Sequence, residues 1–362
     1  MNTSPYSNLP SKSFWRPAVA QQDPRTMHDI FSHSYEIKED TKIATAGSCF
    51  AQHITASLRK RNYTILDVEP PPKGMKSKFR SQHGYEMYSA RYGNIYTTRQ
   101  LLQLFKEIAN QFIPPSNIYV WPHRNGHFID GFRPAVEPIG LPDPSEVIEQ
   151  REQHIKRVRS MIKEMDLFIF TLGLTETWRH KESGIVFPTA PGVIAGEYSE
   201  DDYEMLNLTF QNCVDDFREV MELTQLIRAG KQCHYLLTVS PVPLTATASD
   251  QHILVASTHS KAILRGVAGE LSQSECISYF PSYELVTNPA RRSNGYEENL
   301  RTVRKETVDE VMEYFFLWQK PSLINATQQK EEAPQKTKPK RPKKRRNHIQ
   351  CEEEFNDPSQ NQ

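Results

Sequence analysis

Residues 41–50 read TKIATAGSCF, a short apolar run that ends in Gly47 and Ser48 and leads into a helix-like segment. Four later runs have the same character, and helical patterns separate most of them. These runs are YTILDV (63–68), LFIFTL (167–172), CHYLLTVSPV (233–242) and ISYFPSY (277–283). Short runs that are apolar on both faces and alternate with helices are typical of a parallel sheet covered on both sides. The sequence therefore predicts an α/β fold with a central parallel sheet of five strands.

The length and the cysteine content narrow the class of protein. The chain has 362 residues, which is ample for one α/β domain or two small domains. No stretch reaches the roughly 18 uninterrupted apolar residues of a membrane span, and residues 1–20 lack the apolar core of a signal peptide. The five cysteines are scattered and form no CxxC pair or zinc spacing. We therefore expect a cytoplasmic protein with no disulfide framework, no metal and no organic cofactor.

Charge is unevenly distributed along the chain, although 44 basic residues balance 44 acidic ones. Eight basic residues lie between Lys336 and Arg346, and four acidic residues lie between Glu352 and Asp357. The remainder of the chain has 36 basic and 40 acidic residues, so its charge does not favour nucleic-acid binding. The proline-interrupted basic run predicts a disordered tail over residues 326–362, basic and then acidic. This tail could contact a polyanion or an anionic membrane, or it could be a solvated tail with no dedicated partner.

The rest of the chain divides into an arm and one domain. Four prolines in residues 1–25 predict an irregular N-terminal arm, and residues 26–325 are predicted to form the α/β domain. Residues 85–140, after the second predicted strand, are longer than a crossover needs and predict an insertion with a helix over about 98–112. Its aromatic residues could stack on a sugar ring or form a small core of their own; they include Trp121, Phe128 and Phe132. Apolar stripes predict three further helices. One is capped by Ser145, one runs from Leu206 to Met221, and one runs from Val308 to Phe316.

Small or reactive residues follow four of the five predicted strands. They are Gly47-Ser48-Cys49, Gly173-Leu174-Thr175-Glu176-Thr177, Ser240-Pro241-Val242-Pro243 and Ser282-Tyr283-Glu284. Because ligands of open α/β sheets bind outside the carboxyl ends of the strands, these residues predict an active site on one rim. A serine at the Ser48 position suits a nucleophile at a helix N-terminus, and it equally suits an N-cap. Cys49 is either a rival nucleophile or a buried packing residue.

Six ordered segments between about Phe14 and Trp318 resemble the GSCFA family, which is related to the SGNH/GDSL hydrolases. They are AGSCFA (46–51), NIYTTRQLLQL (94–104), TLGLTETW (171–178), TVSPVPLTAT (238–247), SKAILR (260–265) and YFPSYE (279–284). The resemblance implies a flavodoxin-like three-layer α/β/α sandwich of the SGNH type with strand order 2-1-3-4-5. It also implies ester chemistry, with a small acyl group and a carbohydrate as a candidate carrier.

The resemblance also implies roles for particular residues. Ser48 matches the nucleophile position of SGNH enzymes, and Gly173 and Thr175 fall within the block that carries oxyanion donors. Thr175 stands where those enzymes have an asparagine, and its hydroxyl could still donate a hydrogen bond. Asn94 is another candidate oxyanion donor or, alternatively, a turn residue. Cys49, beside the nucleophile, belongs to the same predicted binding region.

The catalytic base departs from the SGNH pattern. The usual Asp-x-x-His corresponds here to Glu298-Asn299-Leu300-Arg301, and arginine does not deprotonate to act as a base. His252 is the first alternative, followed by His180 and His259, while Glu284 and Glu176 could orient a base or serve as one. The sequence thus supports a serine esterase or acyltransferase, and alternatively an SGNH-like binding module without a base. A third hypothesis makes the basic tail the main functional element, as a tether to nucleic acid or membrane.

Overall fold

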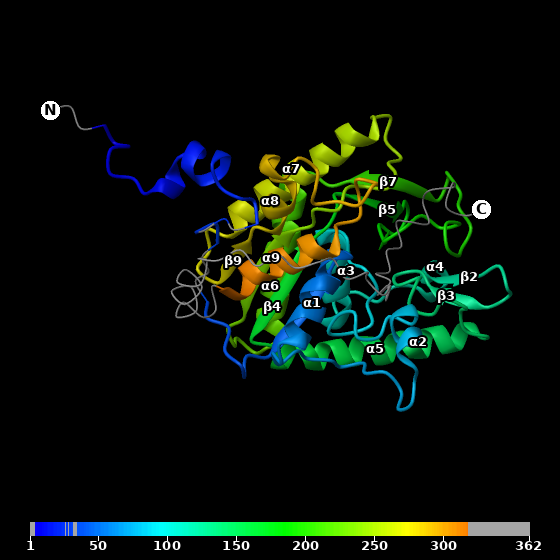
Figure 1. The fold of residues 1–362 in the computed structure, drawn as a ribbon. Coiled ribbons are helices and arrows are strands. Elements are labelled where there is room, and N and C mark those ends of the chain that lie inside the picture. Colours follow the sequence, from blue (N-terminus) through cyan, green and yellow to red (C-terminus); the bar gives the residue numbers. More distant parts are fainter. Residues whose placement is uncertain (1–3, 26, 28, 32–34, 318–362) are drawn as a thin grey trace.

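The computed structural model describes residues 4–25, 27, 29–31 and 35–317, and its centre is a four-stranded parallel sheet (Figure 1). The strands are β1 (Ile43–Gly47), β4 (Leu167–Leu172), β8 (His234–Val239) and β9 (Ile277–Phe280), in the order β1-β4-β8-β9. In register, Phe170 of β4 lies between Ala46 of β1 and Leu237 of β8. The predicted α/β class with a parallel central sheet is confirmed.

Helices cover both faces of this sheet. One apolar cluster joins a face of the sheet to α3 (Thr98–Ile108), α5 (Pro144–Glu164), α6 (Phe210–Ile227) and α7 (Ile253–Leu271). The other cluster joins the opposite face to α1 (Phe50–Lys60), α8 (Ser282–Thr287) and α9 (Lys305–Leu317). Buried aromatic side chains such as Phe168 and Phe280 fill the two interfaces. This double burial explains why the strands are apolar on both sides.

The fifth predicted strand is reduced to a single parallel bridge. Ile65 pairs with Ile43 on the outer side of β1, and its neighbours form no ladder. The chain turns away at once, since Pro70, Pro71 and Pro72 follow two residues after Val68 and cannot donate backbone hydrogen bonds. The bridge still lies where the order 2-1-3-4-5 places its first strand.

Local capping chemistry sets the helix starts. Thr97 and Gln100 form a capping box at α3, and Thr209 and Asn212 form another at α6. The α6 helix therefore begins after Thr209, whereas the stripe pattern had included Leu206, which lies in β7 (Tyr203–Asn207). At α5 the cap is Asp143, whose carboxylate accepts the Ser145 N–H at 2.8 Å, so Ser145 is not itself the cap.

Two further small sheets lie beside the central one. Helix α2 (Ser77–Gln82) comes before the predicted insertion, which contains α3, α4 (Ser116–Tyr119) and the antiparallel pair β2 (Val120–Pro122) and β3 (Phe128–Asp130). A three-stranded antiparallel sheet, which sequence analysis missed, is built from β5 (Glu176–His180), β6 (Val186–Phe187) and β7. Trp121 and Phe132 pack on Phe187, with ring centroids 4.8 and 5.3 Å apart. These aromatic residues form a satellite core between the two small sheets.

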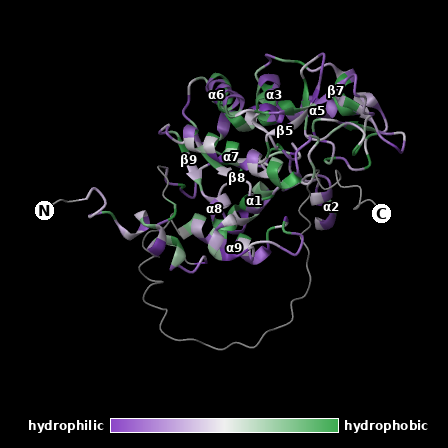
Figure 2. Ribbon diagram, turned by 90° about the horizontal axis from the view of Figure 1, so that it is seen from above, coloured by the Kyte–Doolittle hydropathy of each residue, from purple (hydrophilic) through white to green (hydrophobic). Residues whose placement is uncertain are grey.

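The N-terminal segment projects from the side of the molecule in both views (Figure 1 and Figure 2). Its described residues form two short helical turns, η1 (Ser11–Ser13) and η2 (Arg16–Ala20). The predicted tail over residues 326–362, with its basic run from Lys336 to Arg346, lies outside the described residues. None of the helices in the described part of the chain has the length and apolarity needed to cross a bilayer.

Histidines that the fold shields from water make its stability depend on pH, and His53 shows the effect most directly. Burial lowers the pKa of His53, on α1, from 6.5 to about 4, and the Asp309 carboxylate offsets part of that shift. The unfolded chain therefore binds a proton at His53 as the pH falls below 6.5, while the folded chain resists it until about 4. We expect His53 alone to lower the free energy of unfolding by up to about 2 kcal/mol between pH 7 and pH 5.

Urea unfolding at pH 7 and pH 5 measures this drop. His53→Gln should make the difference smaller by up to about 2 kcal/mol and leave the part due to His154 and His234, whose pKa burial also lowers. Replacement of the exposed His259 by Gln should leave the difference unchanged. An equal drop in the unaltered chain and in His53→Gln would contradict the assignment.

Candidate active site

Ser48 lies at the carboxyl edge of the central sheet, between β1 and α1. Its N–H donates to the Thr171 carbonyl oxygen at 3.2 Å, which fixes the start of α1 against the end of β4. The side chain is only 2% exposed. No group among the described residues hydrogen-bonds its Oγ. A buried hydroxyl without a partner is uncommon and marks a place where a ligand or water is needed.

Two glycines allow the backbone to close around Ser48. A Cβ on Gly47, whose φ is +136°, would lie 2.6 Å from the backbone N and O of Thr171. A Cβ on Gly173 would lie 2.8 Å from Ser48 Cβ and 3.0 Å from the Tyr96 carbonyl oxygen. The turn after β4 is therefore in direct contact with the Ser48 side chain, as predicted from the strand ends.

Asn94 approaches Ser48 from the loop before α3. The Ile95 N–H donates to the Gly47 carbonyl oxygen at 3.0 Å, which draws this loop to the end of β1. The Tyr88 hydroxyl lies 3.1 Å from the Ser48 carbonyl oxygen and 2.5 Å from Asn94 Oδ1. Gln52 Nε2 donates to the same Oδ1 at 3.3 Å. Tyr88 and Gln52 were not predicted from the sequence, since Tyr88 lies outside the six segments and Gln52, which directly follows AGSCFA, was expected only as part of a helix.

The other predicted oxyanion donors already have acceptors within the protein. The Gly173 N–H donates to the Tyr96 carbonyl oxygen at 3.1 Å. The Thr175 N–H donates to Ser260 Oγ at 3.1 Å, and the Thr175 hydroxyl donates to Asn207 Oδ1 at 2.7 Å. Thr175 thus ties the turn after β4 to α7 and β7. Cys49 lies in a small apolar cluster with Tyr96, Leu174, Leu244 and Ala256.

The predicted imidazoles occupy separate positions around the rim. His252 is the exposed N-cap of α7, and its Nδ1 accepts the Leu254 N–H at 3.2 Å. His180 lies in β5, with Nδ1 3.0 Å from Ser183 Oγ. His259 lies in α7 and acts on Glu176 through its charge. Within the described ranges, none of them hydrogen-bonds Ser48 Oγ.

The two predicted carboxylates differ in how they are held. Glu176 opens β5 at the rim, and its two oxygens lie 2.9 and 3.0 Å from the Thr247 hydroxyl. Burial raises the pKa of Glu176, and the Thr247 hydroxyl and the His259 charge offset part of the rise. Glu284 lies within α8 and not at a strand end, because β9 stops at Phe280. It forms an ion pair with Arg265 and accepts the Tyr279 hydroxyl at 2.7 Å.

Residues 298–301, which were expected from the resemblance to correspond to the Asp-x-x-His of SGNH enzymes, reach the loop after β8 through Arg301. Asn299 Oδ1 accepts the N–H groups of Arg301 and Thr302 at 3.0 and 2.9 Å and shapes a turn there. Arg301 Nε donates to the Pro243 carbonyl oxygen at 3.2 Å. The guanidinium therefore serves as a hydrogen-bond donor at this point of the rim.

Buried hydroxyls without partners gather at this edge of the sheet. Four buried side-chain atoms in the described part of the chain lack a hydrogen bond, and three of them follow or end a central strand. These three are Ser48 Oγ after β1, Thr171 Oγ1 in β4 and Thr245 Oγ1 in the loop after β8. Their concentration at one edge supports a ligand site there.

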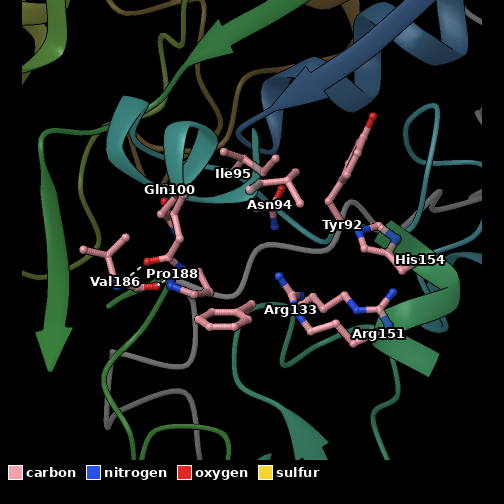
Figure 3. Close-up of a pocket in the computed structure, with 12 residues that line it drawn as sticks. Tyr92, Asn94, Ile95, Gln100, Arg133, Arg151, His154, Val186 and Pro188 are labelled. Atoms are coloured by element: carbon pink, nitrogen blue, oxygen red, sulfur yellow. Dashed lines mark hydrogen bonds between the residues drawn. The ribbon is translucent and has the colours of Figure 1, made fainter. Parts of the chain in front are cut away.

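A small cavity is lined by Asn94 and also by Arg133, Arg151 and His154 (Figure 3). Its volume is about 30 Å³, which is room for one or two water molecules and not for a sugar. Its cations are matched by buried carboxylates: Arg133 and Arg151 both contact Asp130, at 2.7 and 3.2 Å. The residues around this cavity therefore hold the insertion in place against α5.

A buried contact between His154 and Glu69 lies beside this cavity. His154 Nδ1 lies 2.7 Å from the Glu69 carboxylate, and both side chains are almost fully buried. Burial alone would raise the pKa of Glu69, but the contact with His154 and the charge of Arg133 outweigh it and lower that pKa. Both partners are engaged with each other, away from Ser48.

Residues 42–315 match the GSCFA family, and the chain belongs to that family. Among solved structures, the chain aligns with the crystal structure of a carbohydrate esterase family 3 from Talaromyces cellulolyticus. The alignment has 8% sequence identity and a TM-score of 0.33, and it covers 80% of this chain and 99% of that chain. No curated protein matches the chain.

Proposed function

We propose that the protein is a serine esterase or acyltransferase of the SGNH type that acts on a small acyl ester. The observation that carries this proposal is the Ser48 hydroxyl, which is buried and without a partner among the described residues at the junction of β1 and α1. The N-terminus of α1 favours negative charge at that position. A carbohydrate as the carrier of the acyl group rests on the family resemblance alone.

The proposed reaction begins with attack of Ser48 Oγ on the ester carbonyl carbon. The Ser48 proton passes to a base as the new C–O bond forms, and the carbonyl oxygen becomes an oxyanion. Asn94 is the proposed side-chain donor to that oxyanion, since it lies next to Ser48 through Tyr88. Because Ser48 is 2% exposed, an ester reaches Oγ only after the groups that cover it move aside.

The base is proposed from the rim residues. Glu176 is favoured over Glu284, because burial already raises the pKa of Glu176 while Glu284 is neutralised by Arg265. His259 and His252, both on α7, are the proposed imidazoles.

A binding module is the second candidate function. It is favoured by two observations: Ser48 Oγ contacts no imidazole in the described part of the chain, and Arg301 stands where a histidine was expected. Such a protein would keep the pocket and lack turnover.

A fluorophosphonate probe distinguishes the two functions. An activated serine attacks the phosphorus and expels fluoride, so the full chain should gain one phosphonyl group on Ser48, located by mass spectrometry of peptides. Cys49→Ala, altered at the neighbouring residue, should still be labelled, whereas Ser48→Ala should not. Absence of label on the unaltered chain would contradict the esterase and support the binding module.

A further inference from the structure

Lys261 is a buried lysine in the middle of α7, and it has no role in the reaction proposed above. It is 4% exposed, and its Nζ donates to the Gly173 carbonyl oxygen at 2.6 Å. Placing a lysine head group in the interior is costly unless its hydrogen bonds are satisfied. Its place in the fold therefore calls for a specific role.

The hydrogen bond of Lys261 fixes the residue that packs on the nucleophile. Gly173 contacts Ser48 closely enough that a Cβ there would lie 2.8 Å from Ser48 Cβ. The Gly173 N–H is held by the Tyr96 carbonyl oxygen at 3.1 Å. Lys261 holds the carbonyl side of the same residue. Gly173 is thus restrained from both directions beside Ser48.

Ser260, the residue before Lys261 in α7, holds the other end of the turn after β4. Ser260 Oγ accepts the Thr175 N–H at 3.1 Å, and Ser260 is 1% exposed. Two consecutive buried side chains of one helix therefore bind residues 173 and 175. This pairing explains how α7, which is far from β1 in the sequence, controls the surroundings of Ser48.

The charge of Lys261 also lies close to the reacting atoms. The contacts of Gly173 with Lys261 and with Ser48, added to standard bond lengths, place Nζ within roughly 10 Å of Ser48 Cβ. A cation at such a distance in a buried site favours negative charge on a neighbouring atom more strongly than it would in water. Negative charge forms on the attacked carbonyl oxygen in the proposed reaction.

We infer that Lys261 is a positioning residue for Ser48, which holds the Gly173 carbonyl with its ammonium group and stabilises the oxyanion through its charge. This inference rests on the proposed esterase function. The charge of Lys261 supplies the stabilisation of the oxyanion that was expected from two donors in the turn after β4. Those donors, the Gly173 N–H and the Thr175 hydroxyl, both donate to acceptors within the protein.

Lys261→Gln and Lys261→Arg separate charge from hydrogen bonding, because both can donate to the Gly173 oxygen and only arginine keeps the cation. With p-nitrophenyl acetate as the probe, we expect Lys261→Gln to lower kcat on the order of 10²-fold with little change in KM. Lys261→Arg should keep kcat within about fivefold. The rate of fluorophosphonate labelling of Ser48 should follow the same order. Lys231→Gln, at an exposed lysine, is the matched control and should behave like the unaltered chain.

The outcomes are distinguishable from failure of the proposed function. If the unaltered chain is neither labelled nor active, the esterase itself is overturned. If the unaltered chain is labelled and Lys261→Gln is labelled equally fast, only the role of Lys261 is overturned. Equal losses in folded Lys261→Gln and Lys261→Arg would also overturn it, since charge would then not matter. Circular dichroism establishes whether both variants are folded. If they are not, Ser260→Ala is a milder change at the neighbouring α7 side chain that holds the turn after β4.

Discussion

Gly173→Ala is expected to lose ester turnover by at least about 10²-fold while the protein remains folded. The added Cβ would lie 2.8 Å from Ser48 Cβ, closer than real Cβ atoms approach, and 3.0 Å from the Tyr96 carbonyl oxygen, which is also a tight contact. Because the N–H groups of Gly173 and Leu174 hold the Tyr96 carbonyl oxygen, the Ser48 side chain is the group that has to move. A displacement of about 1 Å is enough to cost about 10²-fold in rate when the nucleophile must meet a bound carbonyl.

Gly266→Ala, in α7, is the matched control for this variant. Its Cβ would meet Phe210 at 3.4 Å, an ordinary contact, and alanine suits a helix interior better than glycine. Turnover of p-nitrophenyl acetate and the thermal midpoint should both be preserved in Gly266→Ala. Full activity in Gly173→Ala would mean that the turn after β4 does not shape the site.

Gly47→Ala is expected to destabilise the protein by about 4 kcal/mol, the largest effect on folding that we predict. Two costs combine at this position. The φ of +136° is accessible in practice only to glycine, and the new Cβ would lie 2.6 Å from backbone atoms of Thr171 in β4. Backbone atoms of a central strand cannot rotate aside, so β1 and β4 would have to separate.

Gly184→Ala tests the strain without the clash, since its φ is +72° and nothing lies within 4 Å of the added Cβ. It should cost only about 1 kcal/mol. Urea unfolding of both variants measures the difference. Equal losses of stability in the two would show that the close approach of β1 to β4 contributes nothing.

The parts of the fold that could be predicted were those coded by local patterns. Residues 41–50 are apolar up to a glycine, and they form β1 followed by Ser48 at the edge of the sheet. Residues 63–68 have the same apolar character, yet only Ile65 pairs, because the length of a ladder depends on the neighbouring chain and on the prolines that follow. The β5–β7 sheet was missed, since β6 has only two residues and the longer strands β5 and β7 are partly buried and interrupted by charged residues.

The part of the site that could be predicted was the part formed by residues at the ends of strands. Ser48 and Gly173 meet as expected, because parallel strands bring their carboxyl ends to one edge. Glu284 was expected at a strand end and lies in α8, where Arg265 neutralises it. Lys261 carried no catalytic pattern of its own, although it lies in SKAILR, one of the segments that resemble the family. Its contact with Gly173 depends on how α7 packs over the sheet, which no local pattern shows.

Arg151 has a consequence for efforts to build a minimal version of this domain. It joins α5 to Glu107 of α3 and to Asp130 of β3, and Phe132 packs against its guanidinium. Trimming residues 116–143 as if they were a dispensable ornament would leave this cation short of one carboxylate and uncover Phe187 of β6. Any shortened protein would therefore need apolar residues designed in place of both Arg151 and Glu107, or it would have to carry the whole hairpin as part of its architecture.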